Sequence, residues 1–105
     1  MTAPRSFVDR FGHTIELTTE RWLHVLDRHQ ELQEFEYLIP QTLREPDLVT
    51  HSVYDPKVRL YYKRFAHLWG GKFFVVVVRF NQRCFLLTAY LTDRIKGGER
   101  VWPSG

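Results

Sequence analysis

The chain has 105 residues, of which 44% are hydrophobic and 26% charged, so one domain is expected and a second independent core has no room. Lysine and arginine number 15 against 12 acidic residues, and the formal net charge of +3 permits a polyanionic partner without requiring one. The single cysteine, Cys84, excludes an intramolecular disulfide and cannot by itself supply a structural zinc site.

The longest apolar run extends from Phe73 to Val78 and is bracketed by Lys72 and Arg79. It is much shorter than the roughly 20 residues that a membrane-spanning helix requires, so it predicts a buried strand. The N-terminal residues contain no apolar stretch of signal-peptide length. We therefore expect no membrane association, and a reducing, cytoplasmic location that suits the single cysteine.

The first predicted element is a hairpin of residues 7–9 and 14–17, because Gly12 between them can take the positive φ of a tight turn. A helix follows, capped by a threonine at position 18 or 19. Its apolar face has the spacing i, i+3, i+4 and i+7, formed by Trp22, Val25, Leu26 and His29. His29 is therefore expected on the buried face of this helix or at its rim.

A second apolar helical pattern runs from Phe35 to Leu43, with Pro40 inside it. Proline removes a backbone donor and crowds the carbonyl four residues earlier. We therefore expect a kinked or broken second helix, which Pro46 ends.

From Asp47 onward the apolar period changes to two, and β-branched and aromatic residues dominate, which predicts strands. Four strands are expected, at residues 48–54, 58–65, 72–80 and 84–92. Their connections are short, so neighbouring strands should be antiparallel. The predicted fold is α+β: two N-terminal helices packed on a four-stranded antiparallel sheet, preceded by a short N-terminal hairpin.

Alternation assigns the two faces of this sheet. The last strand is expected to pack on the helices through Phe85, Leu87, Ala89 and Leu91. Its other side carries Leu86, Thr88, Tyr90 and Thr92. On the second strand Leu60 and Tyr62 are the expected core residues, which leaves Arg59, Tyr61 and Lys63 on the opposite face. Basic and hydroxyl groups would then converge on one open surface.

Motifs for most common enzyme chemistries are missing from the sequence, including the P-loop, the dinucleotide-binding motif and the G-x-S-x-G motif. His24 and His29 are five residues apart, so on a helix they diverge by ~140° and cannot hold one metal ion together. The remaining groups suit metal-free phosphodiester cleavage, because histidine transfers protons and lysine or arginine stabilises a phosphorane. RNA supplies its own nucleophile, the 2′-hydroxyl, so no cofactor is needed.

Several local strings resemble small phage- and toxin-associated members of the barnase/EndoU/colicin/RelE nuclease superfamily. They are residues 21–29, 42–47, 61–64 and 88–92, with Lys96 following. The resemblance spans about residues 5–102. It implies two N-terminal helices on a four-stranded antiparallel sheet of the RelE type. It also implies a metal-independent endoribonuclease, an activity that in many members of the superfamily serves a toxin.

The resemblance implies a set of catalytic residues. They are His29 or His24 for proton transfer, Lys63 or Arg64 for the phosphate charge, and Thr88 and Tyr90 for its orientation. The expected substrate-binding residues are Arg59, Tyr61 and Lys96. Alternation places Lys63, and not Arg64, on the face that carries Tyr61. No metal ligand and no cofactor is expected.

Each candidate also has a structural interpretation. His29 ends an apolar helical stripe, which is typical of a core histidine, and Thr88 and Tyr90 are strong strand formers. His29 is also expected on the helix-packed side of the sheet while Thr88 and Tyr90 face away. These groups meet only if His29 reaches around an edge or end of the sheet.

Two other functions fit the same residues. One is a non-catalytic module that binds RNA or a protein on the same fold. The other is an interaction protein whose apolar open face is covered by an antitoxin-like or immunity partner, or by a second copy of the chain. The tail at residues 95–102 is compatible with a loop near the site or with docking of Trp102 on the core.

Overall fold

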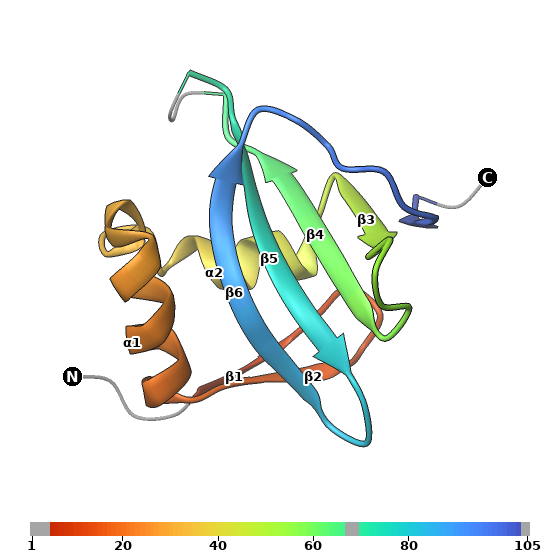
Figure 1. Ribbon diagram of the computed structural model, residues 1–105, viewed down its shortest axis with the longest axis horizontal. Helices are drawn as coiled ribbons and strands as arrows, with labels where there is room; N and C mark the ends of the chain where they lie inside the picture. The colour runs from red at the N-terminus through yellow and green to blue at the C-terminus, as the bar shows by residue number, and fades with distance from the viewer. Residues whose placement is uncertain (1–4, 67–69, 104–105) are drawn as a thin grey trace.

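A computed structural model describes residues 5–66 and 70–103 (Figure 1). Within them, seven strands form one sheet in the order β1-β2-β6-β5-β4-β3-β7. The strands are β1 (Arg5–Val8), β2 (Thr14–Leu17), β3 (Leu48–His51), β4 (Val58–Arg64), β5 (Phe73–Phe80), β6 (Cys84–Thr92) and β7 (Arg100–Trp102). The helices are α1 (Thr19–Arg28), the short 3-10 helix η1 (Gln30–Leu32) and α2 (Leu38–Arg44). In this part of the chain no helix is long and apolar enough to span a bilayer.

The predicted architecture of two helices on a four-stranded antiparallel sheet is wrong. The four expected strands exist as β3 to β6 and are antiparallel neighbours, but the sheet continues on both sides of them. β2 pairs in parallel with the first part of β6, and β7 pairs with β3. Both additions satisfy backbone N–H and C=O groups that an edge strand would otherwise leave unpaired. The sheet is therefore mixed, and the N-terminal hairpin belongs to it.

Local signals near the N-terminus predicted the structure correctly. β1 and β2 form an antiparallel hairpin, as expected. α1 begins after Thr18, whose hydroxyl accepts a hydrogen bond of 3.0 Å from the backbone N–H of Arg21. Trp22 and Val25 on the apolar face of this helix are buried. The capping side chain thus determines where α1 begins, and the apolar stripe determines which face of the helix packs on the core.

The second helix departs from its prediction. α2 begins at Leu38 and not near Phe35, so Pro40 lies in its first turn instead of its middle. The first backbone N–H groups of a helix have no partner within it, so proline costs little there and no kink results. The helix ends at Arg44, shortly before Pro46.

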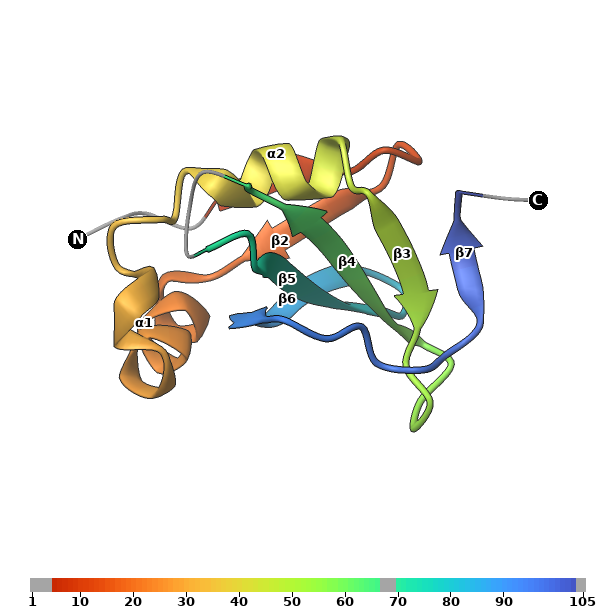
Figure 2. The same ribbon diagram turned by 90° about the horizontal axis from the view of Figure 1, so that it is seen from above.

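The sheet has a core on each of its faces. α2 and the β1–β2 hairpin lie over one face, called here the inner face (Figure 2). The larger core is on this side and includes Leu38, Ile39, Leu43, Tyr61, Phe74 and Val76. A smaller core lies on the opposite, outer face and consists of Val58, Leu60, Tyr62, Val75 and Val77. α1 lies beside β6 (Figure 1). Because β2 pairs only with Cys84 and Phe85 of this strand, the rest of β6 forms a local edge of the sheet.

On β4, the alternation of residue types assigned the side chains to the wrong faces of the sheet. Tyr61 is fully buried in the inner core, whereas Leu60 and Tyr62 belong to the outer core. Arg59 and Lys63 share the parity of Tyr61 and so lie on the inner side. Because both faces of this strand are covered, it lacks the apolar–polar contrast that identifies a buried face.

On β6 a β-bulge interrupts the alternation. Val77 pairs with Thr88 and Val78 with Leu86, so Leu87 is an extra residue between them. The assignments of Ala89 and Leu91 to the inner core and of Thr88 and Tyr90 to the outer face are therefore correct. For Phe85, Leu86 and Leu87 the face assignments are reversed: Leu86 lies in the inner core, and Phe85 and Leu87 lie on the outer side.

The C-terminal segment runs along the outer side of the sheet from β6 to β7 (Figure 2). It passes close to β3 at Gly98, where a side chain would overlap the backbone oxygen of His51, and Gly98 has φ of 151°. Glycine is therefore required at this crossing. Beyond it Trp102 packs against the inner core, with the Arg10 guanidinium 3.8 Å from its ring centroid. Docking of Trp102 is thus the alternative that the structure adopts.

Candidate functional site

Three of the predicted site residues meet on the outer side of the sheet. The ring centroids of His29 and Tyr90 are 6.2 Å apart. The ammonium group of Lys96 lies 5.6 Å from the centroid of the Tyr90 ring. These residues come from the end of α1, from β6 and from the C-terminal segment, and together they are called the outer cluster.

His29 reaches the cluster because it ends α1. Its φ of −135° and ψ of 67° leave the helical region, although its backbone N–H still donates to the carbonyl of Val25. α1 packs beside β6, and the residue that follows the helix, His29, lies with its ring centroid 6.2 Å from that of Tyr90 on β6. The expected conflict between a helix-side histidine and an outer-face tyrosine is resolved in this way.

A carboxylate accompanies the histidine. The Oε2 atom of Glu31 lies 3.8 Å from Nδ1 of His29, and the His29 side chain is 31% exposed. A histidine with one ring nitrogen beside a carboxylate can exchange a proton through the other nitrogen. Glu31 was not predicted as a site residue, although an acidic residue just beyond a helix-terminal histidine is visible in the sequence.

The other two members of the outer cluster differ in burial. Burial, reinforced by the neighbouring Tyr62, raises the pKa of Tyr90 to about 12, so its phenol stays protonated and can donate a hydrogen bond at neutral pH. Lys96 is exposed, and its backbone N–H donates to the hydroxyl of Tyr62 over 3.3 Å. Tyr62, assigned from sequence only to the core, thus helps to position Lys96.

Thr88 and Arg64 also have the outer-face parity. Thr88 lies two residues before Tyr90 on β6, opposite Val77. Arg64 is at the end of β4, where its backbone N–H donates to Asp47 and its guanidinium lies against Gly71.

Lys63 does not share the face of Tyr90, contrary to the prediction that favoured it over Arg64. Its Nζ atom donates a hydrogen bond of 2.7 Å to the backbone oxygen of Glu45. Since Lys63 has the inner-side parity of Tyr61, its ammonium group serves the connection between α2 and β3.

Three further predicted residues lie away from the outer cluster. His24 is exposed on α1, beside Arg21. Tyr61 is buried in the inner core, and the Arg59 guanidinium lies 4.5 Å from the centroid of the Phe80 ring. The predicted joint surface of Arg59, Tyr61 and Tyr90 is therefore wrong, because the faces of β4 were assigned in reverse.

A second polar group was not predicted. The buried carboxylate of Asp9 accepts hydrogen bonds from the backbone N–H groups of Phe11 (3.0 Å) and His13 (2.7 Å). The Tyr61 hydroxyl donates to its other oxygen, which also lies 3.1 Å from Nδ1 of His13. Burial, with the bond to Asp9 and its charge, raises the pKa of Tyr61 well above its ordinary value. Asp9, His13 and Tyr61 are called the inner network, and they join the hairpin turn to the sheet.

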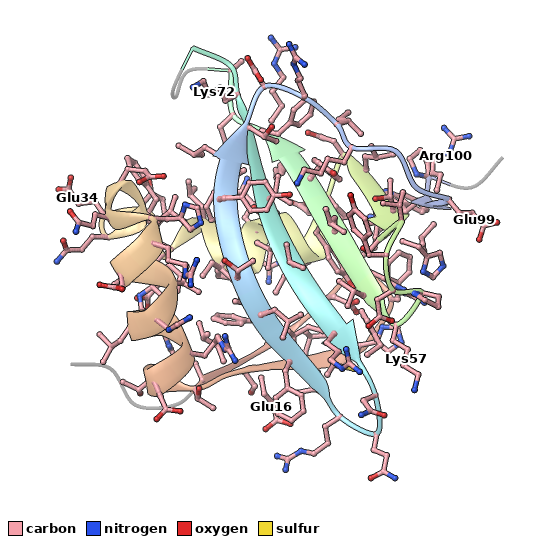
Figure 3. All side chains as sticks on the ribbon, in the orientation of Figure 1. Glu16, Glu34, Lys57, Lys72, Glu99 and Arg100 are labelled. Carbon is pink, nitrogen blue, oxygen red and sulfur yellow. The ribbon has the colours of Figure 1, made fainter. Side chains whose placement is uncertain are left out.

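An apolar pocket of about 220 Å³ adjoins the outer cluster. Val58, Leu60 and Val77 line it from the sheet, and residues 52–54 and Gly97 line it from the loops around the sheet. Tyr90 and Lys96 belong to both the pocket and the outer cluster. The charged residues labelled in Figure 3 lie around the periphery of that view, away from the middle of the outer face.

Within residues 5–66 and 70–103, no group of three or more His, Cys, Asp or Glu side chains could hold a metal ion. Burial raises the pKa of Cys84, which disfavours the reactive thiolate.

A scan of protein-family models and searches of curated proteins and of solved structures gave no match to this chain. Its function is therefore inferred from its own residues.

Proposed function

We propose that the chain is a metal-independent endoribonuclease that acts through the outer cluster. The supporting observation is the convergence of an imidazole, a neutral phenol and an ammonium group from three separate segments. These groups can transfer a proton, donate a hydrogen bond and stabilise negative charge, as cleavage of a phosphodiester requires. The resemblance to the nuclease superfamily points to the same reaction.

In the proposed reaction the RNA supplies the nucleophile. His29 takes the proton of a 2′-hydroxyl, whose oxygen forms a bond to the adjacent phosphorus. Lys96 stabilises the added negative charge of the phosphorane, and the Tyr90 hydroxyl donates a hydrogen bond to one of its oxygens. The bond from phosphorus to the 5′-oxygen then breaks, and that oxygen takes a proton from water. The protonated His29 gives its proton to the hydroxide that remains, which restores the neutral imidazole. The products are a 2′,3′-cyclic phosphate and a 5′-hydroxyl.

Glu31 and Tyr62 act on this site as positioning residues. The Glu31 carboxylate lies 3.8 Å from Nδ1 of His29, on one side of the imidazole, and so helps to set the orientation of the ring. The Tyr62 hydroxyl holds the backbone of Lys96 and so keeps its side chain near Tyr90. Both residues would influence the rate without touching the RNA.

The test uses purified protein with end-labelled transfer and messenger RNA in excess EDTA. The wild type should produce discrete fragments ending in 2′,3′-cyclic phosphate. His29→Ala should lower the rate by about 100-fold or more, the usual contribution of a general acid or base. His24→Ala is the matched control, because it removes an exposed histidine from the same helix and should leave cleavage unchanged. Circular dichroism of each variant checks its folding.

The outcomes separate the competing functions. Equal cleavage by the wild type and His29→Ala would exclude His29 from the reaction. Salt-dependent binding of RNA without any product would favour the non-catalytic binding module. Toxin activity and an antitoxin-like, immunity or second-copy partner stay predictions, and a monodisperse monomer at high concentration would argue against self-association.

A further inference from the structure

Tyr54 is the most exposed of the large hydrophobic side chains among the described residues. It lies in the loop between β3 and β4, and 92% of its surface is accessible, while its neighbour Val53 is 60% exposed. Tyr54 also lines the pocket beside the outer cluster. Its ring is therefore accessible to a ligand that enters this pocket.

The loop that carries Tyr54 is held by specific hydrogen bonds. The backbone N–H of Tyr54 donates to the Ser52 hydroxyl over 3.1 Å, and that of Lys57 donates to Asp55 over 2.9 Å. Asp55 also accepts a hydrogen bond of 2.9 Å from the guanidinium of Arg79 on β5. Tyr54 is thus presented at the rim of the pocket by an ordered turn.

The shape and lining of the pocket suit a small flat ring. Its volume of about 220 Å³ is below the roughly 300–1,000 Å³ of pockets for drug-sized ligands. Aliphatic side chains line it from the sheet, and two aromatic residues, Tyr54 and Tyr90, are among its walls. Bases of single-stranded nucleic acid stack on aromatic side chains in this kind of setting.

The pocket is continuous with the outer cluster. Tyr90 and Lys96 line the pocket and also accompany His29. A base seated in the pocket would bring its own phosphate to the Lys96 ammonium and to the imidazole. The pocket can thereby select which phosphodiester bond lies at the reacting groups.

We propose that this pocket binds one nucleobase of the RNA substrate, with Tyr54 stacking on it. The choice of RNA as the ligand rests on the proposed function. Since a base must leave its helical stack to enter the pocket, the substrate is single-stranded RNA or an unpaired loop. Tyr54 is a substrate-binding residue in this proposal.

Binding is tested with probes that cannot be cleaved. They are short 2′-O-methyl oligoribonucleotides of A, C, G or U and an abasic oligomer of the same length and charge, measured by fluorescence anisotropy. The wild type should bind at least one base-bearing probe about tenfold more tightly than the abasic probe, as expected for one stacked base. Tyr54→Ala should lose most of this preference.

Tyr37→Ala is the matched control. Tyr37 is also exposed, at 65%, but it precedes α2 on the inner side of the sheet. This variant should keep the preference of the wild type. Equal binding of abasic and base-bearing probes, an unchanged preference in Tyr54→Ala, or no binding of any probe would each overturn the base pocket.

The two proposals fail in different ways. A base preference that depends on Tyr54, without cleavage of natural RNA in EDTA, would retain the pocket and reject the ribonuclease. Cleavage that depends on His29, without any base preference, would retain the ribonuclease and reject the pocket.

Discussion

The outer cluster and the inner network both contain a histidine and a tyrosine, and each has a carboxylate at its histidine. In the inner network the Asp9 carboxylate is completely buried and receives hydrogen bonds from side chains and backbone. Beside the outer cluster the Glu31 side chain is 51% exposed, and within the cluster the ring centroids of His29 and Tyr90 are 6.2 Å apart.

Burial of the carboxylate explains the difference between the two regions. A buried carboxylate must be satisfied by donors, so it holds its neighbours in one arrangement and contributes to folding. An exposed carboxylate leaves the neighbouring imidazole and phenol able to bind and exchange protons with a ligand. This contrast favours a stabilising role for the inner network and supports the choice of the outer cluster for the proposed chemistry.

The largest effect should come from breaking the inner network. Asp9→Ala leaves the Tyr61 hydroxyl and two backbone N–H groups without their acceptor, and it should lower the free energy of unfolding by about 3 kcal/mol. Urea denaturation measures the change. Asp27→Ala, at an exposed position on α1, is the control and should change stability by less than about 0.5 kcal/mol. Similar stability of the two variants would contradict the structural role of Asp9.

An intermediate effect should come from the segment that carries Lys96. Gly98→Ala introduces a Cβ that overlaps the His51 backbone at a φ of 151°, and it should cost about 2 kcal/mol of stability. Gly97→Ala is the matched control, because a Cβ there has no atom within 4 Å. Thermal denaturation of both variants tests this difference, and equal midpoints would show that the crossing at Gly98 is not constrained.

The smallest effect concerns the phenol of the outer cluster at alkaline pH. The pKa of Tyr90 rises from an ordinary value of 10.0 to about 12 in the folded chain, so the folded state holds this proton more tightly than the unfolded state does. The resulting stabilisation is complete below pH 10 and is lost as the pH rises from 10 to about 12. Tyr90→Phe should therefore lose less stability than the wild type over this interval.

Denaturation curves at several pH values in that interval measure the slope of stability against pH. Tyr37→Phe, at an exposed position, should retain the slope of the wild type. A slope unchanged by Tyr90→Phe would show that the Tyr90 phenol is not held more tightly in the folded state.

The sequence alone predicted the elements that depend on local signals. Periodicity located β3 to β6 within a few residues, and the Thr18 cap and the Gly12 turn located α1 and the hairpin. These elements could be predicted because each depends on residues close together in the chain. The candidates His29, Tyr90 and Lys96 came from the resemblance to the nuclease superfamily, which also supplied residues that lie elsewhere in the fold.

The tertiary structure decided which of these residues meet. The bulge at Leu87 and the two covered faces of β4 reversed the face assignments, since alternation identifies a buried face only where the other face is in water. The edge position of α1 brought His29 to Tyr90, and the crossing at Gly98 brought Lys96 to the same face. Such contacts join segments far apart in the sequence, so they depend on packing and not on local pattern.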